Sequence, residues 1–310
     1  MLAKKYKKEF LSINNNSDLK GVMNKIIEKE DEYKSKCIDW TIEQIKEFLK
    51  DLNYESPNTI SRAFSFYKNF VKYICNEEQL DCPEYDIQFG TLYDLVDYDK
   101  LLNTTISYEQ FRHIYNQLDK NPRDRCLFGL PWHVMLTNED VKNIKEKDVR
   151  FEEEDGLDVA YIIVDDREIK VEDFELVDDL KQCLRRFDYT IKTKNDKDKK
   201  YKLKETDYLI KPMNVGKKGK DDDISNPSIA LQKVFKREYI TCPGVDILLL
   251  TISNIRRSKI IYLLAPQNEK YFDNELITHF LDAGNIDSNL FWLKKVARMK
   301  YKKKNNDLGD

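Results

Sequence analysis

One short block of strand-like sequence, from Val149 to Val171, interrupts a chain whose apolar residues otherwise recur with helical spacing. Turns at Asp155-Gly156 and at Asp165 to Glu168 divide this block into three segments, of which the middle one, Val159 to Val164, is rich in β-branched residues. Such segments, joined by short turns, are typical of antiparallel strands. A single small sheet in a helical chain predicts the α+β class, mostly helical, because the sheet must bury one face against neighbouring helices.

The N-terminal quarter of the chain is predicted to be helical, because apolar residues recur at three-and-four spacing from Val22 onward. The expected helix starts are a cap at Ser17 or Asp18, a capping box formed by Thr41 and Gln44, and Ser56 followed by Pro57.

The third of these helices, Pro57 to Ile74, combines an apolar face with a polar stripe. Phe66 and Tyr73 lie off the apolar face and are expected to pack on a neighbouring helix. We interpret the stripe as a DNA-binding surface, because cations and hydroxyls along one helix face can follow a phosphate backbone. The stripe consists of Ser61, Arg62, Ser65, Lys68 and Lys72.

The length of 310 residues fits about two domains. We expect a helical domain over residues 1–100, a linker near 100–106 and a second domain over 107–310. The second domain is predicted to begin with a helix capped by Ser107, to stay helical to about Lys145 and to resume helices after the sheet. These later helices are expected at Phe174 to Phe187 and, after a lysine-rich loop, at about Pro227 to Tyr239, Val245 to Leu264, Asn274 to Leu281 and Ser288 to Tyr301.

Several classes of protein are excluded by what the sequence lacks. No run approaches the roughly 18 apolar residues of a membrane helix, and the start MLAKKYKKEF does not resemble a secretory signal. We therefore expect an intracellular protein with no membrane association. The six cysteines form no C-x-x-C pair and the three histidines lie far apart, so we expect reduced thiols and no metal. No glycine-rich nucleotide motif occurs, and no cofactor is expected.

Charge is sorted by region although the formal net charge is only -3. Residues 137–181 carry 17 acidic against 7 basic side chains, whereas residues 192–220 carry 11 basic against 4 acidic. Within the basic region, Lys192, Lys194, Lys217 and Lys218 are candidates for sequence-independent contact with a nucleic-acid backbone. The alternative is a solvated lysine-rich loop.

Five segments, in this order, resemble the tyrosine recombinase family, the phage integrases. The resemblance implies a two-domain fold, with a helical core-binding domain and a helical catalytic-like domain that contains a small antiparallel sheet. It also implies double-stranded DNA as the partner, in the cytoplasm of a bacterial host. The matching segments are Ile106 to Gln110, Asn121 to Arg125, Leu136 to Val149, Ser253 to Ser258, and Leu281 to Trp292.

The catalytic residues of that family are mostly replaced in this chain. The resemblance places Thr137 at the first arginine, Ser253 and Ala283 at two histidines, and Trp292 at the tyrosine nucleophile. The second arginine is kept as Arg256. For the lysine of the hairpin turn, the chain offers Arg167 or Lys170. Because tryptophan has no nucleophilic oxygen, we expect no strand cleavage, and hence no enzyme and no catalytic residue.

The cations Arg256, Arg257 and Lys259 are expected to bind DNA phosphates; the alternative is pairing with acidic side chains. The resemblance further implies self-association on DNA through the C-terminal helix, which could instead pack on its own domain. We therefore expect a sequence-specific phage or prophage repressor that maintains lysogeny, relieved by a protein or peptide effector. The alternatives are an active recombinase with a shifted nucleophile such as Tyr301, and an accessory protein that does not bind DNA.

Overall fold

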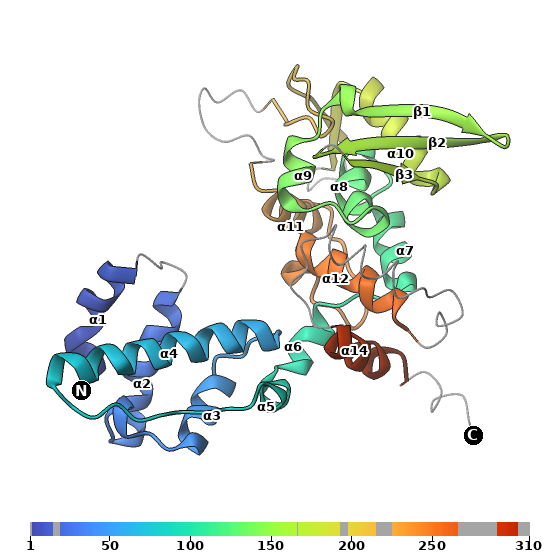
Figure 1. Ribbon diagram of the computed structural model, residues 1–310. Coiled ribbons are helices and arrows are strands. Elements are labelled where there is room, and N and C mark those ends of the chain that lie inside the picture. Colours follow the sequence, from blue (N-terminus) through green and yellow to red (C-terminus); the bar gives the residue numbers. More distant parts are fainter. Residues whose placement is uncertain are drawn as a thin grey trace. The chain divides into compact units, whose positions relative to one another are not determined.

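The computed structural model describes residues 2–14, 19–165, 167–192, 198–214, 225–265 and 290–302. The predicted cap at Ser17 or Asp18, the predicted helix Asn274 to Leu281 and the position of Ala283 lie outside these residues. The chain divides into two compact units, Met1–Leu101 and Leu102–Asp310. Both are predominantly helical, and the second contains the small antiparallel sheet, so the predicted class is confirmed (Figure 1).

The first unit is built around its longest helix, α4 (Pro57–Glu78). The other helices of this unit are α1 (Leu2–Asn14), α2 (Lys20–Tyr33), η2 (Cys37–Asp39), α3 (Ile42–Lys50), α5 (Phe89–Leu92) and η3 (Tyr93–Leu95), with α6 (Tyr98–Asn103) following (Figure 1).

Local signals set the starts of α3 and α4. Thr41 and Gln44 form the predicted capping box of α3. Pro57 occupies the first turn of α4 as predicted, but the Ser56 side chain makes no capping hydrogen bond. Helix α1 was not predicted from the sequence. Its Phe10 packs against Phe66 and Phe70 of α4, with ring centroids 5.4 and 5.0 Å apart.

The second unit begins with α7 (Tyr108–Gln117), whose start is the predicted capping box of Ser107 and Gln110. After α8 (Pro122–His133), α9 (Asn138–Asn143) and η4 (Glu146–Asp148), the chain forms β1 (Val149–Glu154), β2 (Leu157–Val164) and β3 (Arg167–Val171). All pairings are antiparallel, with Val149 opposite Ile162 and Ile162 opposite Ile169. The three predicted strands are confirmed.

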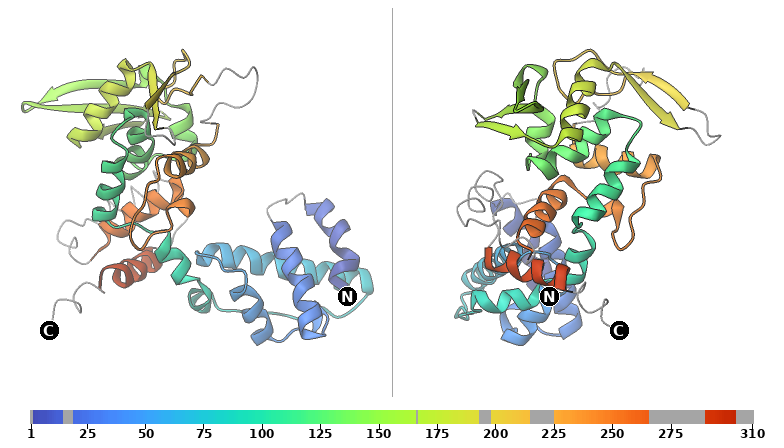
Figure 2. Two further views of the ribbon diagram at one scale, coloured as in Figure 1. Left: turned by 180° about the vertical axis from the view of Figure 1, so that it is seen from behind. Right: turned by 90° about the vertical axis from the view of Figure 1, so that its right-hand side faces the viewer.

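Helix α8 lies at the centre of this unit, in contact with α10 (Phe174–Arg185) and α12 (Ile252–Leu263). Helix α10 also contacts β2, and Figure 2 shows it lying along the sheet. Ala160 and Ile162 of β2 are fully buried, which joins the sheet to the core.

Two features of the second unit differ from the sequence-based expectation. The lysine-rich stretch contains a two-stranded hairpin, β4 (Asp188–Lys192) and β5 (Asp198–Lys202), where only a loop was expected. The helix predicted over Val245 to Leu264 is divided into η5 (Ile247–Leu249) and α12. The division occurs because Thr251 adopts an extended backbone and forms a capping box with Asn254.

Two helices remain to be described: α11 (Pro227–Arg237), which precedes η5, and α14 (Leu290–Lys302), which follows α12. Helix α14 packs against α12 of the same chain, and its apolar residues Trp292, Leu293, Val296 and Ala297 are at most 1% exposed. No described helix is both long and apolar enough to cross a membrane.

Candidate nucleic-acid interface

Three helix starts meet in the second unit, those of α9, α11 and α12. The Asn138 side-chain oxygen in α9 accepts hydrogen bonds from the backbone N–H and the hydroxyl of Ser228 in α11, at 3.1 and 3.0 Å. The Ser228 hydroxyl in turn accepts from the N–H of Ile252 in α12 at 3.0 Å. Because the N-terminus of a helix carries partial positive charge, these three ends together favour a nearby anion.

Arg256 extends from α12 beside these helix starts and is 7% exposed. Its Nε donates a hydrogen bond to the carbonyl of Met135 at 2.8 Å. Met135 has a φ of 54°, in the left-handed region, in the turn between α8 and α9. Burial lowers the pKa of Arg256, and the negative charge of Asp140 only partly opposes this shift.

A second guanidinium, that of Arg167, is carried by the first residue of β3. Its positive charge lowers the pKa of Arg256 further. Lys170, the other candidate from the hairpin, is instead engaged by Glu154 and Glu172 at 2.9 and 2.7 Å. Lys170 is thus paired with carboxylates, and Arg167 is the candidate from this hairpin whose charge acts on Arg256.

Two of the positions that the family resemblance assigns to catalysis, Thr137 and Trp292, have structural roles. Thr137 caps α9, with its hydroxyl accepting from the N–H of Asp140 at 3.1 Å. Ser253 is exposed on the first turn of α12. Trp292 is 1% exposed within the packed face of α14, so its ring belongs to the core.

The other two predicted cations of α12 differ in their surroundings. Arg257 is partly exposed. The Lys259 ammonium lies over the rings of Trp132 and Tyr262, 5.6 and 5.5 Å from their centroids. Burial lowers the pKa of Lys259, against the opposing charge of Asp173. Lys259 is thus held by aromatic rings of its own unit.

In the first unit, the predicted stripe lies on the solvent side of α4. Arg62, Ser65, Lys68 and Lys72 are exposed, and Ser61 is half-buried. The Lys68 ammonium lies 4.8 Å from the centroid of Phe64. Phe66 and Tyr73, which lie off the apolar face predicted for this helix, both pack on Phe10 of α1, as predicted.

The β4–β5 hairpin carries several lysines and is held by polar contacts at the middle of β4. Asn121 receives the N–H of Thr190 on its side-chain oxygen and donates its amide to the carbonyl of Thr190, both at 2.8 Å. Asn121 thus pairs with β4 as a neighbouring strand would. Lys199, Lys200 and Lys202 of β5 are exposed. The side chain of Lys192 and the residues Lys194, Lys217 and Lys218 lie outside the described part of the chain.

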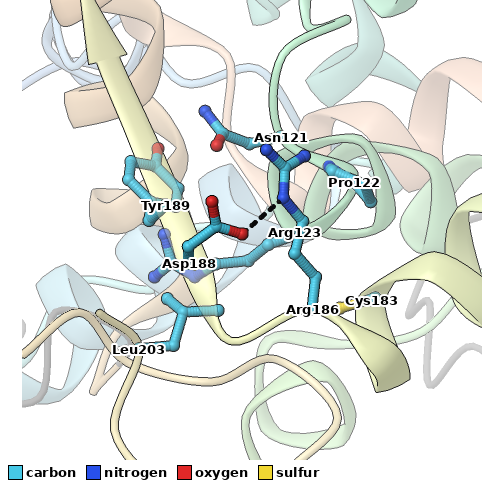
Figure 3. A pocket seen from close by; sticks show the side chains of 8 residues that line it. All are labelled: Asn121, Pro122, Arg123, Cys183, Arg186, Asp188, Tyr189 and Leu203. Atoms are coloured by element: carbon cyan, nitrogen blue, oxygen red, sulfur yellow. Dashed lines mark hydrogen bonds and ion pairs between the residues drawn. The ribbon is translucent and has the colours of Figure 1, made fainter. Parts of the chain in front are cut away.

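Beneath this hairpin lies a buried charge network. The hydroxyl of Tyr189 donates to Asp124, and Arg237 contacts both groups. Burial raises the pKa of Asp124, and the guanidinium groups of Arg123 and Arg237 oppose the shift. A cavity of about 10 Å³, large enough for about one water, lies beside Arg123 and Tyr189 (Figure 3). At its edge, Arg186 pairs with Asp188 at 2.8 Å. These contacts are structural, and they hold the hairpin in place.

Tyr301, the alternative nucleophile, is located elsewhere in the second unit. It lines a pocket with residues of α7 and with Cys242 and Pro243, and neither Arg256 nor Arg167 lines that pocket. Burial raises the pKa of Tyr301. Its hydroxyl is buried and has no hydrogen-bond partner among the described residues.

No group of three or more histidine, cysteine or acidic side chains that could hold a metal is found in the described residues. Four groups have contacts that the sequence did not predict: the hairpin anchor Asn121, the helix-joining residues Asn138 and Ser228, and the carbonyl of Met135. Each acts through a partner that is distant in sequence.

No protein-family model and no curated protein matches the chain. Among solved structures, the chain is similar to a protein described as "Crystal structure of XerA recombinase". The TM-score is 0.39 and the identity 13%, over 96% of each chain. A likeness of this size carries no functional inference.

Proposed function

We propose that this protein binds double-stranded DNA without cutting it and acts as a phage or prophage transcriptional repressor. The observation that carries the proposal is the position of Arg256. Its Nε is held by the carbonyl of Met135, which precedes the cap residue Thr137 of α9, one of the three joined helix starts. Guanidinium groups bind phosphate oxygens in a planar, bidentate geometry. A DNA phosphodiester would supply the negative charge that this cluster favours.

The same region supports binding in place of cleavage. Cleavage by the family mechanism needs an activated tyrosine next to the cations. The corresponding residue Trp292 is a core side chain, and Thr137 is a helix cap. Tyr301 lies in a separate pocket, and its raised pKa disfavours the phenolate.

Two further surfaces would add contacts with DNA. The exposed lysines of the β4–β5 hairpin would bind the backbone without regard to sequence. The α4 stripe has the length and exposed polar groups of a helix that reads bases, and we assign part of the sequence recognition to Arg62 and Ser65. The proposal includes two further parts: the repressor maintains lysogeny, and a protein or peptide effector relieves the repression.

Self-association on DNA is also part of the proposal, with one restriction. The apolar face of α14 is buried within its own unit. Association through this helix would therefore use its exposed residues, such as Arg298 and Met299.

The test is binding of the purified full chain to fragments of the genome that encodes it, across a salt series, with a denaturing gel for covalent adducts. Arg167→Ala should weaken binding and reduce the salt slope by about 0.9, the value for one phosphate contact. Arg150→Ala is the matched control, because Arg150 lies in the same sheet and pairs with Glu152 and Glu168.

Tight, selective and non-covalent binding that depends on Arg167 supports the proposal. A covalent adduct would instead identify a recombinase with a shifted nucleophile. Absence of binding at low salt would leave an accessory protein that does not bind DNA.

A further inference from the structure

Two cysteine side chains meet at the C-terminal end of α4, in the first unit. Cys75 lies in the last turn of this helix and is 1% exposed. Cys82 lies in the segment that follows the helix. All six cysteines of the chain belong to its described part, and Cys82 alone among them is exposed. The proposed DNA interface assigns no role to either thiol.

The way in which α4 ends places these two residues close to each other. Gln79 has a φ of 54°, in the left-handed region, and ends the helix. The N–H of Leu80 then donates to the carbonyl of Cys75 at 2.9 Å. This bond is typical of the Schellman motif, in which the chain turns away from the helix axis. Because Cys82 is two residues beyond Leu80, it follows closely on the backbone bond to Cys75.

The segment after Leu80 runs back along α4. The ring of Tyr85 packs on that of Tyr67, with the ring centroids 5.6 Å apart, and its hydroxyl donates to a backbone carbonyl of η2 at 2.8 Å. Tyr67 lies about two helical turns before Cys75. Cys82 is therefore held between two anchored points, the backbone bond of Leu80 and the packed ring of Tyr85.

The thiols of Cys75 and Cys82 are in contact. Burial and a hydrogen bond with the Cys82 thiol together raise the pKa of Cys75 to about 11. The Cys82 thiol also donates to the carbonyl of Pro83 at 3.8 Å, a long contact from a weak donor. A disulfide requires that the two side chains point toward each other, and hydrogen-bonded thiols meet this requirement with little movement of the backbone.

We propose that Cys75 and Cys82 form a reversible disulfide when a peroxide oxidises the protein. The exposed Cys82 thiolate attacks a peroxide oxygen, the O–O bond breaks, and a sulfenic acid and one water result. The Cys75 sulfur then attacks the Cys82 sulfur, the S–O bond breaks, and a second water leaves with the thiol proton. Two thiols are thus oxidised to one disulfide while the peroxide is reduced to two waters. A dithiol reductant restores both thiols by exchange.

A second pair of cysteines provides an internal control. Burial raises the pKa of Cys126, and a hydrogen bond with the Cys183 thiol adds to this shift, so these two thiols are also in contact. Cys126 is fully buried and Cys183 is 3% exposed. Because oxidation requires access of the peroxide to a sulfur, this pair should stay reduced in the folded protein.

The experiment treats the purified full chain with hydrogen peroxide, blocks the remaining thiols with N-ethylmaleimide and maps the peptides by mass spectrometry without reduction. No DNA is present, so the result is independent of the proposed function. A cross-link between Cys75 and Cys82 should form and should disappear with dithiothreitol, whereas none should join Cys126 to Cys183.

Two variants test the order of the steps. In Cys75→Ala the sulfenic acid at Cys82 has no partner thiol, so its labelling by dimedone should rise about tenfold or more over the natural chain. In Cys82→Ala the Cys75 thiol should resist peroxide, because it is 1% exposed.

The proposal is overturned if Cys82 does not react, if it proceeds to sulfinic acid while Cys75 keeps its thiol, or if it links only to a second copy of the chain. Equal dimedone labelling of Cys75→Ala and the natural chain would also overturn it. Cys82 is exposed, so Cys82→Ala keeps the test valid even if Cys75→Ala fails to fold.

Discussion

The Nε of Arg256 donates its hydrogen bond to the carbonyl oxygen of Met135, at 2.8 Å. This contact joins α12 to the turn that separates α8 from α9. It fixes the guanidinium through Nε, the nitrogen bonded to the aliphatic part of the side chain. Arg256 is only 7% exposed. The terminal nitrogens of a guanidinium can bind two oxygens of one phosphate group.

Replacement of Arg256 together with Arg257 by alanine should weaken DNA binding. The plot of log K against log salt should become flatter by about 0.9 for each phosphate contact that is lost. Circular dichroism of the variant would verify that the helices are intact. An unchanged slope would remove these two residues from the phosphate interface.

Substitution of Trp292 by tyrosine should not create a strand-cleaving enzyme. The side chain at this position is 1% exposed, so a phenol there would lie in the core, away from any DNA phosphate. The measurement is a denaturing gel after incubation with DNA, which should show no covalent adduct. Adduct formation by the tyrosine variant would mean that α14 leaves its packed position on DNA.

Trp292→Ala should lower the free energy of unfolding by roughly 3–5 kcal/mol, because it removes a buried side chain.

Lys68→Ala combined with Lys72→Ala should reduce DNA affinity and the salt slope, because both ammonium groups are exposed on the α4 stripe. A matched double variant is Lys46→Ala with Lys50→Ala, which has the same spacing on α3. Filter binding at several salt concentrations compares the two. Equal losses in both variants would indicate general charge attraction and no specific role for α4.

Asn121→Ala should loosen the β4–β5 hairpin at the middle of β4. The N–H and the carbonyl of Thr190 would both lose their partners, at a cost of about 1–3 kcal/mol for each buried group left unsatisfied. Urea denaturation would give the global effect, and hydrogen exchange of the hairpin amides would show the local one. Asn116→Ala, at an exposed position of α7, serves as the control. Unchanged exchange in β4 would contradict the assigned role of Asn121.

Stability should depend on the protonation of Asp179. Burial raises the pKa of this carboxyl to about 6, although the Tyr115 hydroxyl and Arg125 oppose the shift. In the unfolded chain the same carboxyl titrates near 3.9. Between about pH 4 and pH 6 the folded protein therefore retains a proton that the unfolded chain has lost, and the contribution to stability falls as pH rises.

The measurement is the free energy of unfolding in urea for the natural chain and for Asp179→Asn at several pH values. The variant should gain stability relative to the natural chain as pH rises through this window, by up to about 3 kcal/mol. Comparison of the two proteins cancels the opposite effect of His133, whose pKa burial lowers to about 4. A difference that is constant with pH would contradict this account.

The sequence predicted those elements whose signals are local. The capping boxes at Thr41 and Ser107 and the three strands between Val149 and Val171 depend on residues within one turn or one alternating run. Helix α1 was missed because its apolar residues Ala3, Tyr6 and Phe10 are diluted by lysines, and their burial depends on α4.

The hairpin and the site show the limit of such signals. Strand β5 reads Asp-Lys-Lys-Tyr-Lys and has almost no apolar pattern, and β4 is fixed by Asn121, which is distant in sequence. The candidates Arg256 and Arg167 were both found by their resemblance to a motif. The bond from Arg256 to the Met135 carbonyl, and the pairing of Lys170 with Glu154 of another strand, depend on tertiary packing that no local pattern encodes.

The order of partners along the chain has a consequence for its synthesis. The first unit is continuous in sequence, so every residue that packs within it has been synthesised once Leu101 has been added. The segment that follows depends on much later residues, since the N–H of Ile106 donates to the Ser258 hydroxyl and the carbonyls of Leu102 and Thr105 accept from Lys300. Nascent chains that lack α14 would therefore carry a folded first unit followed by an unfinished second one.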